Sequence, residues 1–198
     1  MTVLKTRAKL VDVARQLFAK MGVDNTTMND IAVASKKGRR TLYTYFKSKE
    51  EIYLAVVESE LEILSDTLVC VIEKDISPEE KLIEMIYTRL DAVKEVVYRN
   101  GTLRAKFFRD IWRVEKVRKK FDTKQIQLFK TVLKEGQEKG VFALEDIDLL
   151  ADLLQYCLKG IEVPYIRGRI GANLDAETRK KYVANIVFGA LHKIEINK

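Results

Sequence analysis

The chain has 198 residues, which is enough for one domain of ordinary size, or two small ones, with a substantial core. Its composition, 47% hydrophobic and 33% charged with only two prolines, is globular and excludes an intrinsically disordered chain. The formal net charge is +7, and all of this excess lies in residues 1–50, which hold eleven Lys and Arg against four Asp and Glu. Basic charge confined to one end of a chain indicates contact with a polyanion there.

Neither the cysteines nor the apolar segments indicate secretion or a membrane. Cys70 and Cys157 do not make a disulfide framework, and their apolar helical surroundings predict reduced core residues. No apolar run reaches the roughly 18 residues of a membrane span, and no apolar signal core follows the early charges. We therefore expect a cytoplasmic protein without a membrane partner.

Two helices are predicted at the start of the chain. Apolar residues recur at helical spacing from about Leu4 to Met21 and predict the first. Thr27 then precedes Asp30 by three residues, the spacing at which a hydroxyl caps a helix start and a carboxylate bonds back to it. A short supporting helix from Thr27 to Ser35 is therefore expected.

A sharp turn and a second short helix follow. In the turn, Gly38 can take a positive φ or an open capping geometry. The new helix begins near Arg39, with Leu42 and Phe46 four residues apart on its inner face. Two arginines, a hydroxyl and two phenols remain outward or at the flank, and such groups suit base edges and phosphates. They are Arg39, Arg40, Thr41, Tyr43 and Tyr45.

The rest of the chain predicts further helices and no strand. A long helix begins at Ser48, with Glu51 completing a capping box, and runs to about residue 74. Another begins at Ser77, which is followed by a proline at the first helical position, and ends near residue 100. The others are expected over about 102–120, over about 122–139, from near Asp146 toward Tyr165, and from near Asp175 onward. The fold class is all-α, with about nine helices.

The segment from Thr27 to Glu50 resembles the TetR (tetracycline repressor) family of bacterial transcriptional regulators. Its apolar anchors, its turn length, T-L-Y-x-Y-F at 41–46 and S-K-E at 48–50 agree with the family in order and spacing. The resemblance is strong over the first quarter of the chain. The chain departs from the family's usual Ala-Gly-Val-Ser turn, in whose place stand Ser35, Lys36, Lys37 and Gly38.

The resemblance implies a helix-turn-helix DNA-binding domain at 1–47 and a helical effector-binding and dimerisation domain at 48–198. It implies a double-stranded DNA operator, an unidentified small-molecule effector and a homodimer formed by the last two helices as a four-helix bundle. Those two helices could instead cover only their own core. The residues expected at DNA are Thr27, Asn29, Lys37, Gly38, Arg39, Arg40, Thr41, Tyr43, Tyr45 and Lys49.

Aromatic residues in the body are candidates for lining the effector site, with plain core packing as the alternative. They are Tyr87, Phe108, Trp112, Phe129 and Tyr156. A second basic cluster between Arg104 and Lys120 is interpreted as a solvated face, or else as a contact for an acidic effector or DNA flanks. The single histidine, His192, has no partner at metal-ligand spacing, so it is interpreted as a surface or packing residue. We expect no cofactor, no metal and no enzymatic activity.

These observations predict a DNA-binding transcriptional regulator, a ligand-responsive repressor that binds a palindromic operator as a homodimer. The alternative is a helical ligand-binding or protein-interaction module whose basic head docks an acidic partner. Steep salt dependence on duplex DNA with a sequence preference supports the first, and DNA-independent capture of an acidic protein supports the second.

Overall fold

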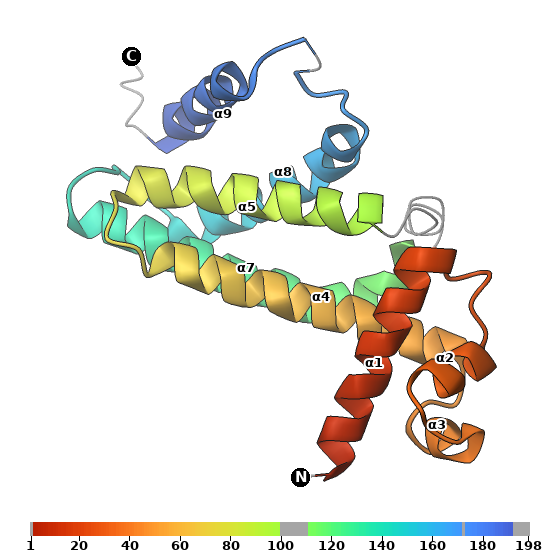
Figure 1. Cartoon of the computed structure of the whole chain (residues 1–198). Coiled ribbons are helices and arrows are strands. Elements are labelled where there is room, and N and C mark those ends of the chain that lie inside the picture. Colours follow the sequence, from red (N-terminus) through yellow and green to blue (C-terminus); the bar gives the residue numbers. More distant parts are fainter. Residues whose placement is uncertain (1, 100–110, 172, 192–198) are drawn as a thin grey trace. The chain divides into compact units, whose positions relative to one another are not determined.

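The structure is a computed structural model, and it describes residues 2–99, 111–171 and 173–191. These residues form eight α-helices and no strand (Figure 1), which confirms the all-α class. None of the eight combines the length and the apolar character that a membrane-spanning helix needs. The helices are α1 (Thr2–Met21), α2 (Met28–Ala34), α3 (Arg39–Tyr45), α4 (Lys49–Ile72), α5 (Pro78–Arg99), α7 (Ile111–Glu138), α8 (Ile147–Ile166) and α9 (Ala176–Leu191).

The chain divides into two compact units. Unit 1 comprises Met1–Ile63 and Glu95–Lys120, and unit 2 comprises Leu64–Lys94 and Phe121–Lys198. Helices α1, α2 and α3 belong to unit 1, whereas α4, α5 and α7 each contribute one segment to each unit. The domain boundary expected after residue 47 stays a prediction.

The start of α2 is fixed by the predicted capping box. The Thr27 Oγ1 accepts the backbone N–H of Asp30 at 3.1 Å, and the Asp30 carboxylate accepts the backbone N–H of Thr27 at 2.8 Å. Hydrogen bonds from the Thr27 side chain and backbone lower the pKa of Asp30. In the turn, Gly38 is the N-cap of α3 in an extended conformation with φ −65°, and the positive φ of 55° belongs to Lys36. Gly38 therefore supplies the open capping geometry and not the positive φ.

Helices α1, α2 and α3 and the first part of α4 pack around one apolar core. Leu42 and Phe46 are 0% and 1% exposed, which confirms the predicted inner face of α3. The ring of Phe18 meets that of Tyr53 edge to face with centroids 6.4 Å apart. The Arg7 guanidinium covers the Phe46 ring at 5.2 Å from its centroid. These contacts fix the rotation of α3, so its other face is held toward solvent.

The prediction of two helices that meet near Phe121 is wrong, because α7 is continuous there. Phe121 is buried at 4% exposure. The Asp122 carboxylate does not cap a new helix but accepts hydrogen bonds from Gln155 Nε2 at 2.8 Å and Lys159 Nζ at 3.0 Å, both on α8. Residues 102–110 of the predicted helix lie outside the described part of the chain.

A buried polar network joins α5, α7 and α8 inside unit 2. Arg89 is 0% exposed, and its guanidinium donates to Gln125 Oε1 at 2.6 Å and to Gln155 Oε1 at 2.8 Å. It also forms an ion pair with Glu162, whose carboxylate oxygen lies 2.6 Å from Nη2. The same guanidinium lies 5.9 Å from the centroid of the Phe121 ring. The buried positive charge is thus matched by a buried negative charge and by two amide oxygens.

The end of α7 packs against Phe142, which is 3% exposed. A Cβ atom at Gly136 would lie 2.1 Å from the Phe142 ring, so this contact requires a glycine. The Gly136 carbonyl also accepts the backbone N–H groups of Val141 at 2.8 Å and Phe142 at 3.2 Å.

The prediction that Cys70 and Cys157 are core residues is wrong, because both are exposed free thiols. Their apolar neighbourhoods are real, but each cysteine lies beside the buried stripe of its helix, next to Val71 and Leu158 respectively. On α8 the exposed face is itself apolar, so the pattern of the sequence does not distinguish it from a core face.

Candidate nucleic-acid interface

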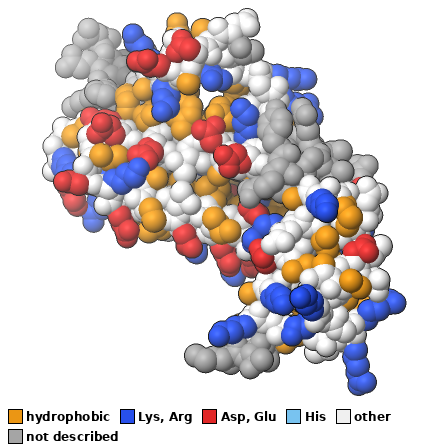
Figure 2. Space-filling view, viewed as in Figure 1, with side chains coloured by type: hydrophobic (Ala, Val, Ile, Leu, Met, Phe, Trp, Pro, Cys, Tyr) orange, Lys and Arg blue, Asp and Glu red, His pale blue; other side chains and the backbone are white. Residues whose placement is uncertain are grey.

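The candidate interface is a basic surface on α3 and the turn before it, which we call the α3 surface: Lys36, Lys37, Arg39, Arg40 and Tyr43. Arg39 and Arg40 are exposed, and Tyr43 is 42% exposed. Thr41 and Tyr45 are half-buried at the flank. Figure 2 shows Lys and Arg side chains gathered over the part of the molecule that holds α1, α2 and α3 in Figure 1.

The cations of the α3 surface are available to a ligand. Within the described residues, no carboxylate forms an ion pair with Lys36, Lys37, Arg39 or Arg40. Arg15 differs from them, because it pairs with Asp12 at 3.0 Å and Glu60 at 2.8 Å. Exposed guanidinium groups on a helix of fixed rotation can reach base edges and phosphates without first breaking an internal ion pair.

Two residues expected at DNA have internal partners. The Thr27 hydroxyl takes part in the capping box and donates to Asp30 at 2.7 Å. The Lys49 ammonium donates to the carbonyls of Val23 at 2.8 Å and Asp24 at 3.1 Å, so it ties the loop before α2 to the start of α4. Both residues therefore have a structural role in unit 1, and their contact with DNA stays a prediction.

The start of α4 has a variant of the predicted capping box. The Ser48 Oγ accepts the backbone N–H of Glu51 at 3.2 Å, as expected. The Glu51 carboxylate reaches the backbone N–H of Lys47 at 2.5 Å. This reciprocal pair fixes the chain as it leaves α3.

Lys36 and Val33 belong to the exposed part of the helix-turn-helix and were not among the predicted site residues. Val33 is 70% exposed on α2, and Lys36 is exposed in the turn. The helical period could have indicated Val33, because the buried Ile31 and Ala32 place it on the opposite face. Asn29, which was predicted, is also exposed on α2.

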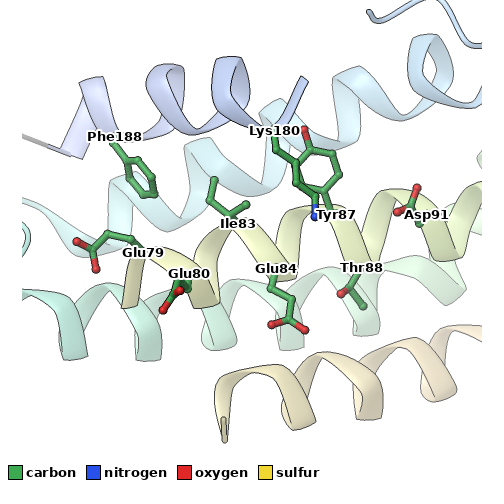
Figure 3. A pocket seen from close by; sticks show the side chains of 9 residues that line it. All are labelled: Glu79, Glu80, Ile83, Glu84, Tyr87, Thr88, Asp91, Lys180 and Phe188. Carbon is green, nitrogen blue, oxygen red and sulfur yellow. The ribbon is translucent and has the colours of Figure 1, made fainter. Parts of the chain in front are cut away.

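Of the aromatic residues proposed for an effector site, the three whose side chains the structure describes do not line one cavity. Tyr87 lines a cavity of about 520 Å³ between α5 and α9 (Figure 3). Phe129 is 0% exposed in the core, and Tyr156 is 65% exposed on α8; neither lines this cavity. Phe108 lies outside the described residues, as does the side chain of Trp112. The ligand-binding role of all five stays a prediction.

The sequence also singled out a second basic cluster and one histidine. In the basic cluster between Arg104 and Lys120, Arg118 is only 3% exposed, so the interpretation as a solvated face is wrong at that residue. Lys120 is exposed and lies 3.7 Å from Glu58. His192 lies outside the described residues. Among the residues that are described, no three His, Cys, Asp or Glu side chains gather as metal ligands would.

Known sequences resemble this chain over most of its length. The HTH-type transcriptional regulator QacR of Staphylococcus aureus is 23% identical over 161 residues, which cover 80% of this chain and 85% of that protein. The probable acrEF/envCD operon repressor of Escherichia coli is 26% identical over 179 residues, which cover 86% of this chain and 80% of that protein.

Solved structures share the fold. A transcriptional regulator from Cytophaga hutchinsonii has a TM-score of 0.75 at 22% identity, over 93% of this chain and 97% of that chain. A regulator of the TetR/AcrR family from Thermobifida fusca has a TM-score of 0.66 at 20% identity, over 94% and 98% of the two chains.

The amino-terminal residues carry the family match. The model of the family described as bacterial regulatory proteins, tetR family, matches residues 10–56, which contain α2, α3 and the α3 surface. Residues 10–56 therefore match the tetR family of bacterial regulatory proteins, and the relatives that are similar over most of this chain are named as transcriptional regulators.

Proposed function

We propose that this protein is a ligand-responsive transcriptional repressor that binds a palindromic DNA operator as a homodimer. The observation that carries the proposal is the α3 surface: basic side chains without ion pairs to described residues stand on a short helix whose inner face is buried. A helix held in this way can lie in a major groove, and phosphate neutralisation by its cations would make binding steeply dependent on salt. The acidic-partner alternative is not favoured, because the relatives are named as transcriptional regulators.

Within this proposal, Arg39 and Arg40 contact bases or phosphates, and Thr41 and Tyr43 contact phosphates or base edges. An arginine that reads a guanine makes two hydrogen bonds to one base, so its loss weakens binding at one operator position by about 1–3 kcal/mol. An arginine that touches a phosphate contributes equally on every sequence. Measuring the affinity of an arginine variant for operators mutated at one position at a time therefore separates the two roles. Thr27, Asn29, Tyr45 and Lys49 are proposed to contact the DNA backbone and so to position the protein on the duplex, and Lys37 and Gly38 are proposed as further DNA contacts.

Exposed apolar side chains on α8 and α9 support a homodimer formed by these two helices. Leu153 and Tyr156 on α8 are 51% and 65% exposed, and Ile186 on α9 is 75% exposed. Gly160 and Gly189 lie within the same two helices, and a Cβ at either would meet nothing within 4 Å. A glycine inside a helix costs about 0.5–1 kcal/mol relative to alanine, and nothing within the described chain requires one there. Close approach of a partner helix would explain both the glycines and the exposed apolar residues.

Effector control follows if the ligand has different affinities for two conformations of the regulator. Helix α4 is proposed as the connection, because it starts directly after α3 and its residues belong to both units. A ligand that stabilises a conformation in which the two α3 helices no longer match successive major grooves would lower operator affinity.

The experiment that tests the proposal measures binding of the variants Arg39→Ala and Arg40→Ala to duplexes selected from a random pool. Lys124→Ala is the matched control, because Lys124 is an exposed cation on α7 far along the chain from the α3 surface. The arginine variants should lose affinity and reduce the slope of log K against log salt by about 1 each if they contact phosphate, while Lys124→Ala stays at the wild-type value. Equal affinities for all three variants would refute the assignment of the α3 surface.

A further inference from the structure

The turn between α2 and α3 places a lysine in a backbone conformation that favours glycine. Lys36 has a φ of 55°, in the left-handed region, where a Cβ atom crowds the following carbonyl oxygen. A glycine would relieve this crowding, so the local backbone geometry does not account for the lysine. The other described residues with a positive φ are all glycines: Gly22, Gly140, Gly168 and Gly171.

The hydrogen bonds of the turn show a second mismatch at the next residue. The backbone N–H of Lys36 donates to the Val33 carbonyl and that of Lys37 to the Ala32 carbonyl, both at 3.0 Å. These are the two bonds of a Schellman motif, which usually has glycine at the first donor position and often an apolar contact at the second. In this chain both positions carry a lysine. The turn therefore holds two ammonium groups that its own geometry does not need.

The Lys36 ammonium does not stabilise the turn through a partner of its own. Lys36 is exposed, and no carboxylate of the described chain forms an ion pair with it. No Asp or Glu occurs between Asp30 and Glu50, whereas six Lys and Arg do, four of them within residues 36–40. The Asp30 carboxylate is engaged in the capping box of α2. Such a cluster of like charges is unfavourable until a polyanion neutralises it.

The position of Lys36 suits a phosphate better than a base. When the second helix of a helix-turn-helix lies in the major groove, the first helix crosses the DNA backbone. Lys36 lies between these two helices, in the turn that joins α2 to α3 in Figure 1. A lysine ammonium is a compact charge on a flexible stem, so it can reach a phosphate oxygen beside the groove while α3 faces the bases.

We propose that the Lys36 ammonium contacts a DNA phosphate, so that the left-handed turn lowers the stability of unit 1 and raises its affinity for duplex DNA of any sequence. This role rests on the DNA binding proposed above for the α3 surface. Sequence is read by residues of α3, and Lys36 adds a contribution that is equal on every duplex. Replacement of Lys36 by glycine should therefore stabilise the fold and weaken DNA binding at the same time.

Three variants separate the charge of Lys36 from its backbone conformation. Lys36→Arg keeps the charge and the Cβ, Lys36→Gln keeps only the Cβ, and Lys36→Gly keeps neither. Each full-length variant is titrated with a duplex selected from a random pool and with an unrelated duplex of equal length, over a range of salt concentrations. Lys124→Gln is the matched control, because it removes an exposed cation on α7.

Loss of the charge should weaken binding to both duplexes by the same factor. For Lys36→Gln and Lys36→Gly we expect about fivefold to tenfold at about 0.1 M salt, since one phosphate contact releases about 0.9 counterion. The slope of log K against log salt should fall by about 1 in both variants. Lys36→Arg and Lys124→Gln should bind within about twofold of the wild type. In urea unfolding, Lys36→Gly should raise the midpoint more than Lys36→Gln, because only glycine removes the Cβ.

The phosphate contact is overturned if Lys36→Gln binds both duplexes like the wild type, or if its loss is confined to the selected duplex. Equal urea midpoints for Lys36→Gln and Lys36→Gly would overturn the stability cost of the turn.

The variants Arg39→Ala and Arg40→Ala in the same titrations keep this test distinct from the proposed function. If they weaken binding and Lys36→Gln does not, the α3 surface still binds DNA and only the role of Lys36 fails. If Lys36→Gln weakens binding and the arginine variants do not, the phosphate contact stands and the assignment of the two arginines fails. If the wild type binds neither duplex, the proposed function fails and the role of Lys36 with it.

Discussion

Replacement of Arg89 by Met tests whether the buried network holds unit 2 together. The guanidinium makes four hydrogen bonds, two of them to Glu162, and both residues are almost fully buried at 0% and 2% exposure. Arg89→Met leaves the buried Glu162 carboxylate without the guanidinium. Breaking one side of a buried pair costs about 3–5 kcal/mol, which is a large share of the 5–15 kcal/mol typical of a folded domain.

The assay is urea unfolding followed by circular dichroism, with all variants at one protein concentration because dimerisation would make stability concentration-dependent. We expect Arg89→Met and Glu162→Leu each to lower the free energy of unfolding by several kcal/mol. The double variant should lose much less than the sum of the two, because an apolar pair of similar volume leaves no buried charge. A loss below about 1 kcal/mol for Arg89→Met, or additive losses in the double variant, would show that the buried network does not hold unit 2 together.

Three further predictions concern the stability of the chain. Lys36→Gly should raise the free energy of unfolding by about 1 kcal/mol, because a φ of 55° is unfavourable for a residue with a Cβ; an unchanged urea midpoint would count against it. Gly136→Ala should lower the free energy of unfolding by about 1–3 kcal/mol, because the added Cβ would lie 2.1 Å from an aromatic ring; a neutral result in the same assay would show that the ring is not held in place. Hydrogen bonds from Lys139 and then Lys81 lower the pKa of Glu135 below its ordinary 4.5, so its stabilising contribution is present above that value and is lost as pH falls through the folded-state pKa. The difference in stability between the wild type and Glu135→Gln should therefore narrow below pH 4.5, and a difference independent of pH would contradict this.

Helix starts could be predicted because their signals are local. The cap residues Thr27, Ser77 and Asp146 each accept a backbone N–H three residues ahead, at 3.1, 3.2 and 2.9 Å. The continuity of α7 could not be predicted in the same way. Asp122 is a competent cap in isolation, and only the position of α8 decides that its carboxylate bonds to Gln155 instead.

The exposure of the basic surface could also be predicted, because the inward positions Leu42 and Phe46 determine the outward ones. The partners of Lys49 could not, since they are backbone carbonyls about 25 residues away that depend on the fold of the loop. The positive φ at Lys36 could not be predicted, because Gly38, two residues later, is the residue type that most readily adopts a positive φ. The exposure of Cys157 could not be predicted either. Helical periodicity shows that an apolar face exists, but it does not show whether another part of the protein covers that face.

Operator binding by the α3 surface is tested most directly by selection of bound duplexes from a random DNA pool, followed by titration of the selected duplex at two salt concentrations. We expect an enriched inverted repeat, bound by two chains, with affinity that falls steeply as salt rises. Weak binding without sequence preference at either salt concentration would contradict the claim that the α3 surface reads an operator.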